Sequence, residues 1–123
     1  MSSSRADYVW MDGEFVDWDD AKVPVLTHAL HYGTAVFEGI RAYPSEDNVN
    51  IFRLRDHIDR MMQSARIYYI DHKYTAEELC STTVELVRKN NIRSRAYIRP
   101  IIYVGYKSIG LNFTGFPINA AII

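Results

Sequence analysis

The pattern of this chain predicts an α+β fold, in which two helices pack on one face of a mixed or antiparallel sheet. Three observations predict it. The first 18 residues alternate around a turn signal, residues 55–89 contain two stretches with helical spacing, and residues 95–104 and 118–123 are rich in β-branched and aromatic side chains. With 123 residues, the chain has the length of one domain with its own core.

The amino-terminal part predicts a hairpin. Asp12-Gly13 separates the strand-like runs Tyr8–Met11 and Glu14–Trp18. Asp-Gly is typical of two-residue hairpin turns because both residues tolerate positive φ angles. A polar connector, residues 19–22, should follow.

The segment from Leu26 to Tyr43 predicts a short helix or turn over Thr27–Tyr32, followed by a strand that ends at Tyr43. The next stretch, residues 44–50, is rich in Pro, Asp and Asn, which favour a loop or long hairpin turn. A strand should resume over residues 49–53.

Two helices should follow. Apolar residues recur every three or four positions over Arg55–Tyr68, which predicts an amphipathic helix. Thr75-Ala-Glu-Glu78 is a capping box that predicts the start of a second helix, and Asn90-Asn91 predicts its end. The strands over residues 95–104 and 118–123 should be separated by a loop over residues 105–117.

Composition excludes several classes of function. The 14 basic and 15 acidic residues give a net charge of -1, which does not favour nucleic acid or an anionic membrane. No apolar run approaches the roughly 20 residues that span a bilayer, and residues 1–5 lack the apolar run of a secretory signal. A single cysteine, Cys80, fits a reducing cytoplasm. The four histidines lack the spacing of a zinc site.

The segment His31–Tyr43 is the most informative part of the chain. It combines two glycines, several aromatic residues and the opposite charges of Glu38 and Arg41 within a largely apolar strand pattern. We expect Glu38 and Arg41 to form a buried structural ion pair or a sheet network rather than to act in catalysis. Further on, Tyr97 and Arg99 stand two residues apart, so both should project from one face of a strand and offer partners to an anion.

These motifs resemble the small domain of the fold-type IV pyridoxal-phosphate (PLP) enzymes, and most closely the branched-chain amino-acid aminotransferases. The resemblance runs nearly end to end, through these segments: 6–13, 31–43, 52–57, 97–100 and 104–105. It implies that the chain, residues 1–123, is the amino-terminal domain of a two-domain enzyme whose cofactor-bearing lysine lies in the second domain. No lysine of this chain matches that lysine, and we assign no catalytic residue here.

The resemblance also implies roles for individual residues. Arg60, which the helical pattern alone would leave as a solvated arginine, would bind the cofactor phosphate. Tyr97 would meet the α-carboxylate of the substrate, and Arg99 would help to bind the distal carboxylate of glutamate. Phe37 would line the pocket for the branched side chain, and Gly39 would leave room for it.

Two further residues, Tyr32 and Leu111, would enter the pocket of the neighbouring subunit, which implies a homodimer or a higher homo-oligomer. The implied reaction moves an amino group from L-leucine, L-isoleucine or L-valine to 2-oxoglutarate. Alternatives within the fold are a D-amino-acid aminotransferase and an aminodeoxychorismate lyase. The alternative outside catalysis is a domain that dimerises or binds without reacting.

The carboxyl end carries an apolar strand pattern, Ala120–Ile123, without a turn or a polar tail. We expect this strand to lead toward the second domain, so that the present chain is a truncated form. We also expect the strand to leave apolar surface that could pair with another chain at a sheet edge.

Overall fold

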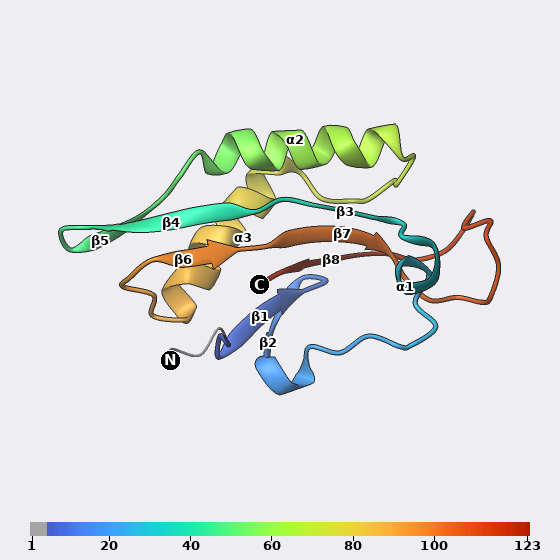
Figure 1. Cartoon of the computed structure of the whole chain (residues 1–123), viewed down its shortest axis with the longest axis horizontal. Helices are drawn as coiled ribbons and strands as arrows, with labels where there is room; N and C mark the ends of the chain where they lie inside the picture. Colours follow the sequence, from blue (N-terminus) through green and yellow to red (C-terminus); the bar gives the residue numbers. More distant parts are fainter. Residues whose placement is uncertain (1–4) are drawn as a thin grey trace.

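The structure is a computed structural model, and it describes residues 5–123. Residues 1–4, on which the absence of a secretory signal partly rests, lie outside the described part. The chain forms two antiparallel sheets, one of five strands in the order β2-β1-β8-β7-β3 and one of three strands in the order β5-β4-β6 (Figure 1). The strands are β1 (Tyr8–Met11), β2 (Glu14–Asp17), β3 (Ala35–Phe37), β4 (Ile40–Ser45), β5 (Asn48–Ile51), β6 (Ala96–Ile98), β7 (Pro100–Val104) and β8 (Ile118–Ile122).

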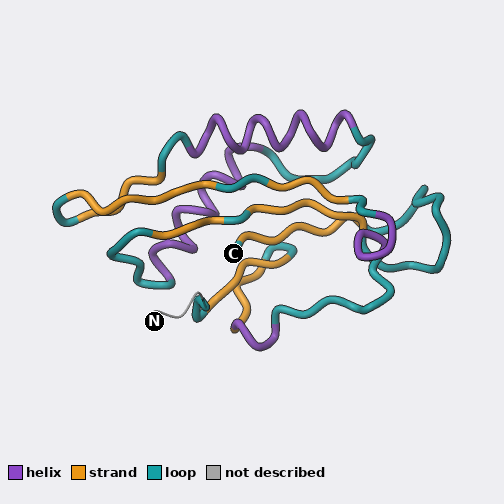
Figure 2. Tube along the Cα trace, in the orientation of Figure 1, coloured by secondary structure: helices purple, strands orange, loops and turns teal. Residues whose placement is uncertain are grey.

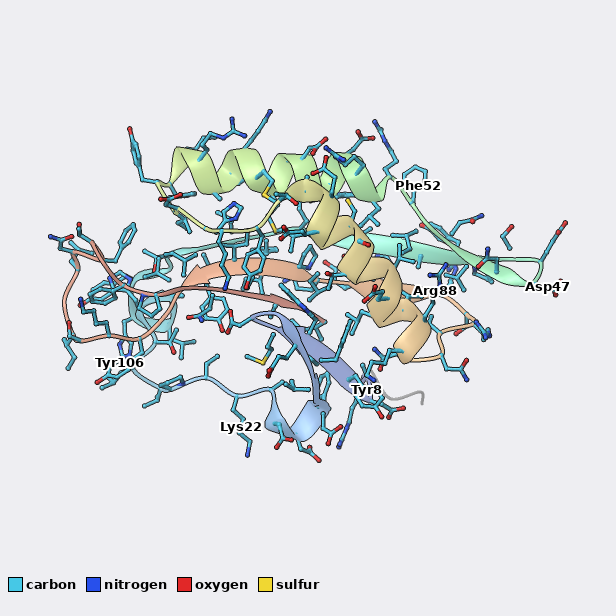
Figure 3. The ribbon with its side chains drawn as sticks, turned by 180° about the vertical axis from the view of Figure 1, so that it is seen from behind. Tyr8, Lys22, Asp47, Phe52, Arg88 and Tyr106 are labelled. Atoms are coloured by element: carbon cyan, nitrogen blue, oxygen red, sulfur yellow. The ribbon has the colours of Figure 1, made fainter. Side chains whose placement is uncertain are left out.

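In the described part of the chain, three α-helices and one short 3-10 helix accompany the sheets: η1 (Trp18–Asp20), α1 (His28–Tyr32), α2 (Leu54–Ile67) and α3 (Ala76–Lys89). Seen from behind, α3 crosses the strands of the five-stranded sheet while α2 runs along its β3 side (Figure 3). The α+β class with two main helices on one face is therefore confirmed, and the sheets are antiparallel.

The predicted hairpin is present. Asp12 and Gly13 have φ angles of 50° and 101°, as a two-residue turn of this kind requires. The Asp12 carboxylate also accepts hydrogen bonds from the backbone N–H of Ala120 at 2.8 Å and from Nδ2 of Asn119 at 3.0 Å. The turn therefore fixes the hairpin to β8.

The expected loop or long hairpin turn over residues 44–50 is a hairpin, but its turn is shorter than expected. β4 continues through Pro44 to Ser45 and pairs with β5 across a two-residue turn at Glu46-Asp47. A proline is tolerated there because β6 pairs only with residues 40–42 of β4. Beyond Ala42, one side of β4 has no partner among the described strands.

Both main helices lie within one residue of their predicted bounds. Thr75 caps α3 by accepting a hydrogen bond from the backbone N–H of Glu78 at 3.1 Å, and Asn90 ends the helix. Asn90 also fixes α3 to the hairpin, because its Oδ1 accepts from the backbone N–H of Tyr8 at 2.9 Å. The core lies between the helices and the sheets. It includes Ile58 and Met61 of α2, Leu79 and Leu86 of α3, and Ile102 and Ile122 of the five-stranded sheet.

Two strands that the sequence predicts as continuous are each divided. Glu38-Gly39 separates β3 from β4, and Arg99 separates β6 from β7. At these residues the chain passes between the five-stranded sheet and the three-stranded sheet. We call Glu38, Gly39 and Arg99 the sheet junction. The backbone of Arg99 pairs with Ile123, donating at 2.8 Å and accepting at 3.0 Å, while Glu38 donates to the carbonyl of Pro100 at 3.1 Å.

The expected free edge at the carboxyl end is also wrong. β8 lies between β1 and β7 and pairs with both. Ala120, Ala121 and Ile122 are buried in the core of the sheet. The apolar run is therefore internal packing rather than a surface for edge pairing.

Within residues 5–123, none of the helices is long and apolar enough to cross a membrane.

Candidate active site

Three side chains at or beside the sheet junction form one cluster: Phe37, Tyr97 and Arg99. Arg99 donates from Nη2 to the hydroxyl oxygen of Tyr97 at 2.6 Å. Its guanidinium carbon lies 4.3 Å from the ring centroid of Phe37 and 5.3 Å from that of Tyr97. The rings of Phe37 and Tyr97 are 56% and 50% exposed, so the cluster is open to a ligand. Tyr97 and Arg99 do share a face, as their spacing predicts.

Gly39 allows this arrangement because the Tyr97 ring lies directly against its backbone. A Cβ at position 39 would collide with the Tyr97 hydroxyl and lie 2.9 Å from its Cζ. Any larger residue would have to displace the ring that contacts Arg99. The glycine is therefore explained by a close approach within the candidate site, and its φ angle plays no part.

Arg99 has spare hydrogen-bonding capacity. Its Nε is buried and has no hydrogen-bond partner among the described residues. Buried donors are nearly always paired, because an unpaired one costs about 1–3 kcal/mol. An arginine held between aromatic rings with a donor to spare is suited to a carboxylate.

Glu38 points the other way from Phe37, into the protein, where it is 5% exposed. Its Oε2 accepts from Nε of Arg60 at 2.7 Å, and its Oε1 accepts from Nη2 of Arg60 at 2.6 Å. Nδ1 of His57 lies 2.9 Å from the same Oε1. The Glu38 carboxylate therefore accepts two hydrogen bonds from Arg60 and lies next to His57, and both of these residues belong to α2.

The expected buried pair of Glu38 with Arg41 is wrong. Arg41 is exposed, and its guanidinium lies 5.7 Å from the ring centroid of Tyr97, on the face of the sheet opposite to Glu38. Glu38 and Arg41 stand three positions apart in an extended segment, so they project to opposite faces. The idea of a structural network rather than a lone charge holds, but Arg60 and His57 are its partners.

The electrostatics of this network follow from its geometry. The hydrogen bond from Arg60 lowers the pKa of Glu38 more than burial raises it, and His57 lowers it further. In return, Glu38 raises the pKa of Arg60. The side chain of Arg60 is 67% exposed, and Glu38 occupies only its Nε and Nη2. The remaining amino group, Nη1, can donate to a phosphate, so the arginine fits the cofactor role that the resemblance implies.

Tyr32 and Leu111 lie together, but away from the junction. Tyr32 is in α1, before β3, whereas Phe37 is at the far end of that strand. Leu111 is in the loop between β7 and β8, which returns beside α1 (Figure 2). Both contact His28, whose ring centroid is 4.5 Å from that of Tyr32 and whose Nε2 is 3.0 Å from the Leu111 carbonyl. They are 42% and 71% exposed, and their expected entry into a neighbouring subunit stays a prediction.

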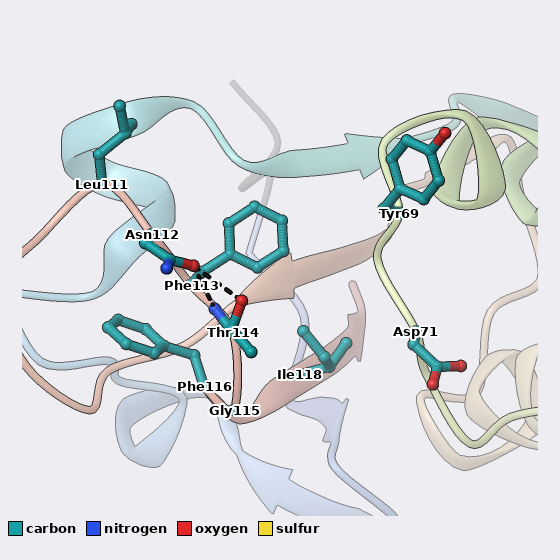
Figure 4. Close-up of a pocket in the computed structure, with 9 residues that line it drawn as sticks. All are labelled: Tyr69, Asp71, Leu111, Asn112, Phe113, Thr114, Gly115, Phe116 and Ile118. Atoms are coloured by element: carbon teal, nitrogen blue, oxygen red, sulfur yellow. Dashed lines mark hydrogen bonds between the residues drawn. The ribbon is translucent and has the colours of Figure 1, made fainter.

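A hollow lies under the same loop, between it and the segment after α2 (Figure 4). Tyr69 and Asp71 line one side, and loop residues 111–116 line the other. Asn112 shapes the loop by accepting from the backbone N–H of Thr114 at 3.0 Å and from its hydroxyl at 2.8 Å. Asp71 is the one acidic residue among the lining residues and none of them is basic, so this hollow does not suit an anionic cofactor or substrate.

Sequence analysis does not identify two residues that contact the candidate site residues in the structure, His57 and His28. Sequence analysis considers His57 only as a potential metal ligand, although His57 and Arg60 stand three positions apart and share a helix face. It considers His28 in the same way, although His28 lies only three residues before the informative segment. The usable signal for His57 is the helical spacing. The sequence does not reveal the contacts of His28 with Leu111, Phe113 and Phe116, because these residues lie in a distant loop.

Residues 35–123 match the protein family described as amino-transferase class IV. The chain belongs to this family. Among curated relatives, the branched-chain-amino-acid aminotransferase of Escherichia coli (strain K12) is 49% identical over 91% of this chain, and that of Pseudomonas aeruginosa is 43% identical over 98%. The chain spans 36% and 39% of the lengths of these two relatives.

Solved structures of branched-chain aminotransferases have the same fold. The enzyme of Thermoproteus uzoniensis with norvaline matches with a TM-score of 0.91 and 46% identity, over 97% of this chain and 40% of that one. The T.th. enzyme complexed with N-(5'-phosphopyridoxyl)-L-glutamate matches with a TM-score of 0.91 and 42% identity, over 96% and 39%. The predicted family and fold are therefore confirmed.

Proposed function

We propose that the complete protein is a PLP-dependent branched-chain amino-acid aminotransferase. It transfers the amino group of L-leucine, L-isoleucine or L-valine to 2-oxoglutarate and releases a branched-chain 2-oxo acid and L-glutamate. Residues 1–123 form its amino-terminal small domain, which supplies the substrate pocket and part of the phosphate site. The names of the relatives support this assignment, since proteins 43–49% identical to the chain are branched-chain aminotransferases.

The observation that carries the proposal is the cluster of Phe37, Tyr97 and Arg99 at the sheet junction. A transaminase must accept an apolar amino acid and an acidic oxo acid in one pocket, in alternation. The exposed ring of Phe37 provides an apolar wall. Arg99, beside it, provides a cation that a distal carboxylate can engage and an aliphatic side chain can leave solvated.

Tyr97 is suited to the α-carboxylate, which both substrates share. Its oxygen accepts the hydrogen bond from Nη2 of Arg99, so its own hydroxyl hydrogen remains to be donated. The arginine therefore orients the tyrosine, and Gly39 gives the ring its place. Binding of N-(5'-phosphopyridoxyl)-L-glutamate by the T.th. relative supports a site for a glutamate carboxylate in this fold.

Arg60 is the proposed phosphate ligand of this domain. Glu38 holds two of its donor nitrogens and thereby orients the third toward a bound phosphate. When bound, PLP supplies the electron sink for removal of the α-proton, and the protein supplies position and charge. This chain binds and orients the cofactor and the substrate, because Arg60, Tyr97 and Arg99 can each donate hydrogen bonds to an anionic group.

The residue that bears the cofactor should lie outside this chain. The four lysines are exposed and lie away from the junction: Lys22, Lys73, Lys89 and Lys107. Tyr32 and Leu111 should complete the pocket of a second subunit, so the active form is a homodimer or a higher homo-oligomer. We place the enzyme in the cytoplasm, where a free thiol such as that of Cys80 is stable.

The test uses the complete protein with PLP. We expect formation of L-glutamate and 4-methyl-2-oxopentanoate from L-leucine and 2-oxoglutarate, and no reaction with D-alanine. Turnover of D-alanine in place of L-leucine would make the protein a D-amino-acid aminotransferase. Pyruvate release from aminodeoxychorismate would make it a lyase, and absence of all three reactions with PLP bound would leave a binding domain.

A further inference from the structure

Among the described residues with an ionisable side chain that the proposed site does not use, His28 is the most deeply buried. It is 1% exposed and opens α1, and three aromatic rings surround its imidazole. The ring centroids of Tyr32, Phe113 and Phe116 lie 4.5, 5.5 and 5.3 Å from that of His28. Two of these rings belong to the loop between β7 and β8, so His28 lies where that loop packs against α1.

The hydrogen bonds of His28 fix its ring. Nε2 lies 3.0 Å from the carbonyl oxygen of Leu111. Because a carbonyl only accepts, Nε2 carries the hydrogen and donates it. Nδ1 lies 2.7 Å from Oγ1 of Thr34, and in the neutral ring it accepts the hydrogen of that hydroxyl. The Leu111 carbonyl therefore sets the tautomer, and the Thr34 hydroxyl holds the other ring nitrogen in place.

His28 contacts the loop at two separate points. Its ring holds the Leu111 carbonyl, and its backbone N–H donates to the carbonyl of Gly105 at 3.4 Å, where the loop leaves β7. Other bonds close the loop on itself, such as Phe116 N–H to the Phe113 carbonyl at 3.0 Å. The ring of His28 instead ties the Leu111 part of the loop to the body of the domain.

We propose that His28 is a positioning residue that holds Tyr32 and Leu111 as one unit for the substrate pocket of a second subunit. The inference rests on the proposed function. Tyr32 and Leu111 belong to different elements, both are substantially exposed, and His28 contacts each of them. An exposed loop residue would lose conformational entropy each time it entered a neighbour's pocket, and a buried anchor removes most of that loss before binding.

The first test measures the anchor itself, by amide hydrogen exchange of the complete protein. His28→Phe keeps an aromatic ring and removes both side-chain hydrogen bonds. We expect exchange within residues 106–116 to become roughly fivefold faster, while α2 and α3 keep their rates. The matched control is His31→Phe, which removes a bond of the same kind on the same helix, from Nε2 to the Val25 carbonyl at 2.9 Å. The control should leave loop exchange unchanged.

The second test measures the effect on the site. In the complete enzyme, His28→Phe should raise the KM for L-leucine about fivefold and change kcat less than about twofold. In a Leu111→Ala background it should raise KM no further, because His28 acts through that residue. His28→Gln retains an N–H donor and should restore part of the wild-type KM.

Three results would overturn the proposal: unchanged loop exchange, equal effects of the two histidine variants, or KM effects of His28→Phe and Leu111→Ala that multiply. If His28→Phe raises exchange throughout the domain, Thr34→Val is the variant to use instead. It removes the hydrogen bond to Nδ1 that holds the His28 ring and leaves His28 in place. We then expect faster exchange within residues 106–116 and unchanged rates in α2 and α3. A complete protein that exchanges as expected but transfers no amino group would refute the proposed function, and with it the role of His28 in a pocket. An active enzyme with an unaffected loop would refute the role of His28 alone.

Discussion

Replacing Glu38 by glutamine should weaken the binding of PLP to the complete protein, although Glu38 touches neither the cofactor nor the substrate in the proposed site. The substitution keeps the size of the side chain and removes its charge. Glu38 accepts two hydrogen bonds from Arg60, at 2.7 and 2.6 Å, and lies 2.9 Å from Nδ1 of His57. Without the carboxylate, the fork of Arg60 loses the partner that fixes its orientation.

The magnitude follows from burial. Arg60 is 67% exposed, so solvent screens its two bonds to Glu38, and each contributes less than a buried charged hydrogen bond would. A glutamine oxygen can retain one of them. The loss of one screened bond should therefore raise the Kd for PLP about two- to fivefold.

The assay is a fluorescence titration of the complete apoprotein with PLP. Glu85→Gln is the matched control, since it makes the same change at an exposed position of α3. Arg60→Lys should raise the Kd to a similar extent, and combining it with Glu38→Gln should add little, because both act on one contact. A Kd that changes less than about twofold in Glu38→Gln, or equally in Glu85→Gln, would refute the role of Glu38.

Three further predictions concern the same junction. Because Arg60 and His57 lower the pKa of Glu38 from 4.5, the contribution of Glu38 to stability is present above about pH 4.5 and is lost as the pH falls through the lowered pKa. In urea unfolding of the complete protein, the difference in unfolding free energy between wild type and Glu38→Gln should therefore shrink below about pH 4.5. A difference in unfolding free energy that grows at low pH would contradict the direction of this pKa shift. Gly39→Ala should displace the Tyr97 ring and raise the KM values of L-leucine and 2-oxoglutarate at least about fivefold, with an unchanged circular dichroism spectrum; an unaffected KM would show that the close approach is not needed. Arg99→Ala should impair turnover of L-glutamate and 2-oxoglutarate more than that of L-leucine, by at least about tenfold, and equal losses would exclude its role in recognising both substrates.

Local signals are sufficient for most of the fold. The Asp12-Gly13 turn, the helical spacing before Tyr68 and the Thr75 cap each depend on neighbours in the sequence, and each is predicted within one or two residues. The division of the strands at Glu38-Gly39 and Arg99 is not predicted. It coincides with a change of partner: Ile98 pairs with β4, whereas Arg99 pairs with Ile123 in a distant part of the chain, and such a change leaves no periodic pattern.

The candidate site divides in the same way. The shared face of Tyr97 and Arg99 follows from strand alternation, so their spacing alone predicts it. The partner of Glu38 does not follow: alternation places the nearest opposite charge in the sequence, Arg41, on the opposite face, but it does not identify the residue that takes its place. Arg60 reaches Glu38 only through the packing of α2 beside β3, which is a tertiary feature.

The most direct measurement is a crystal structure of the complete protein with N-(5'-phosphopyridoxyl)-L-glutamate. We predict its phosphate within hydrogen-bond distance of Nη1 of Arg60, its α-carboxylate at the Tyr97 hydroxyl and its distal carboxylate at Arg99. A ligand that binds away from the sheet junction, or whose carboxylates contact neither Tyr97 nor Arg99, would contradict the assignment of this domain as the substrate-binding part of an aminotransferase.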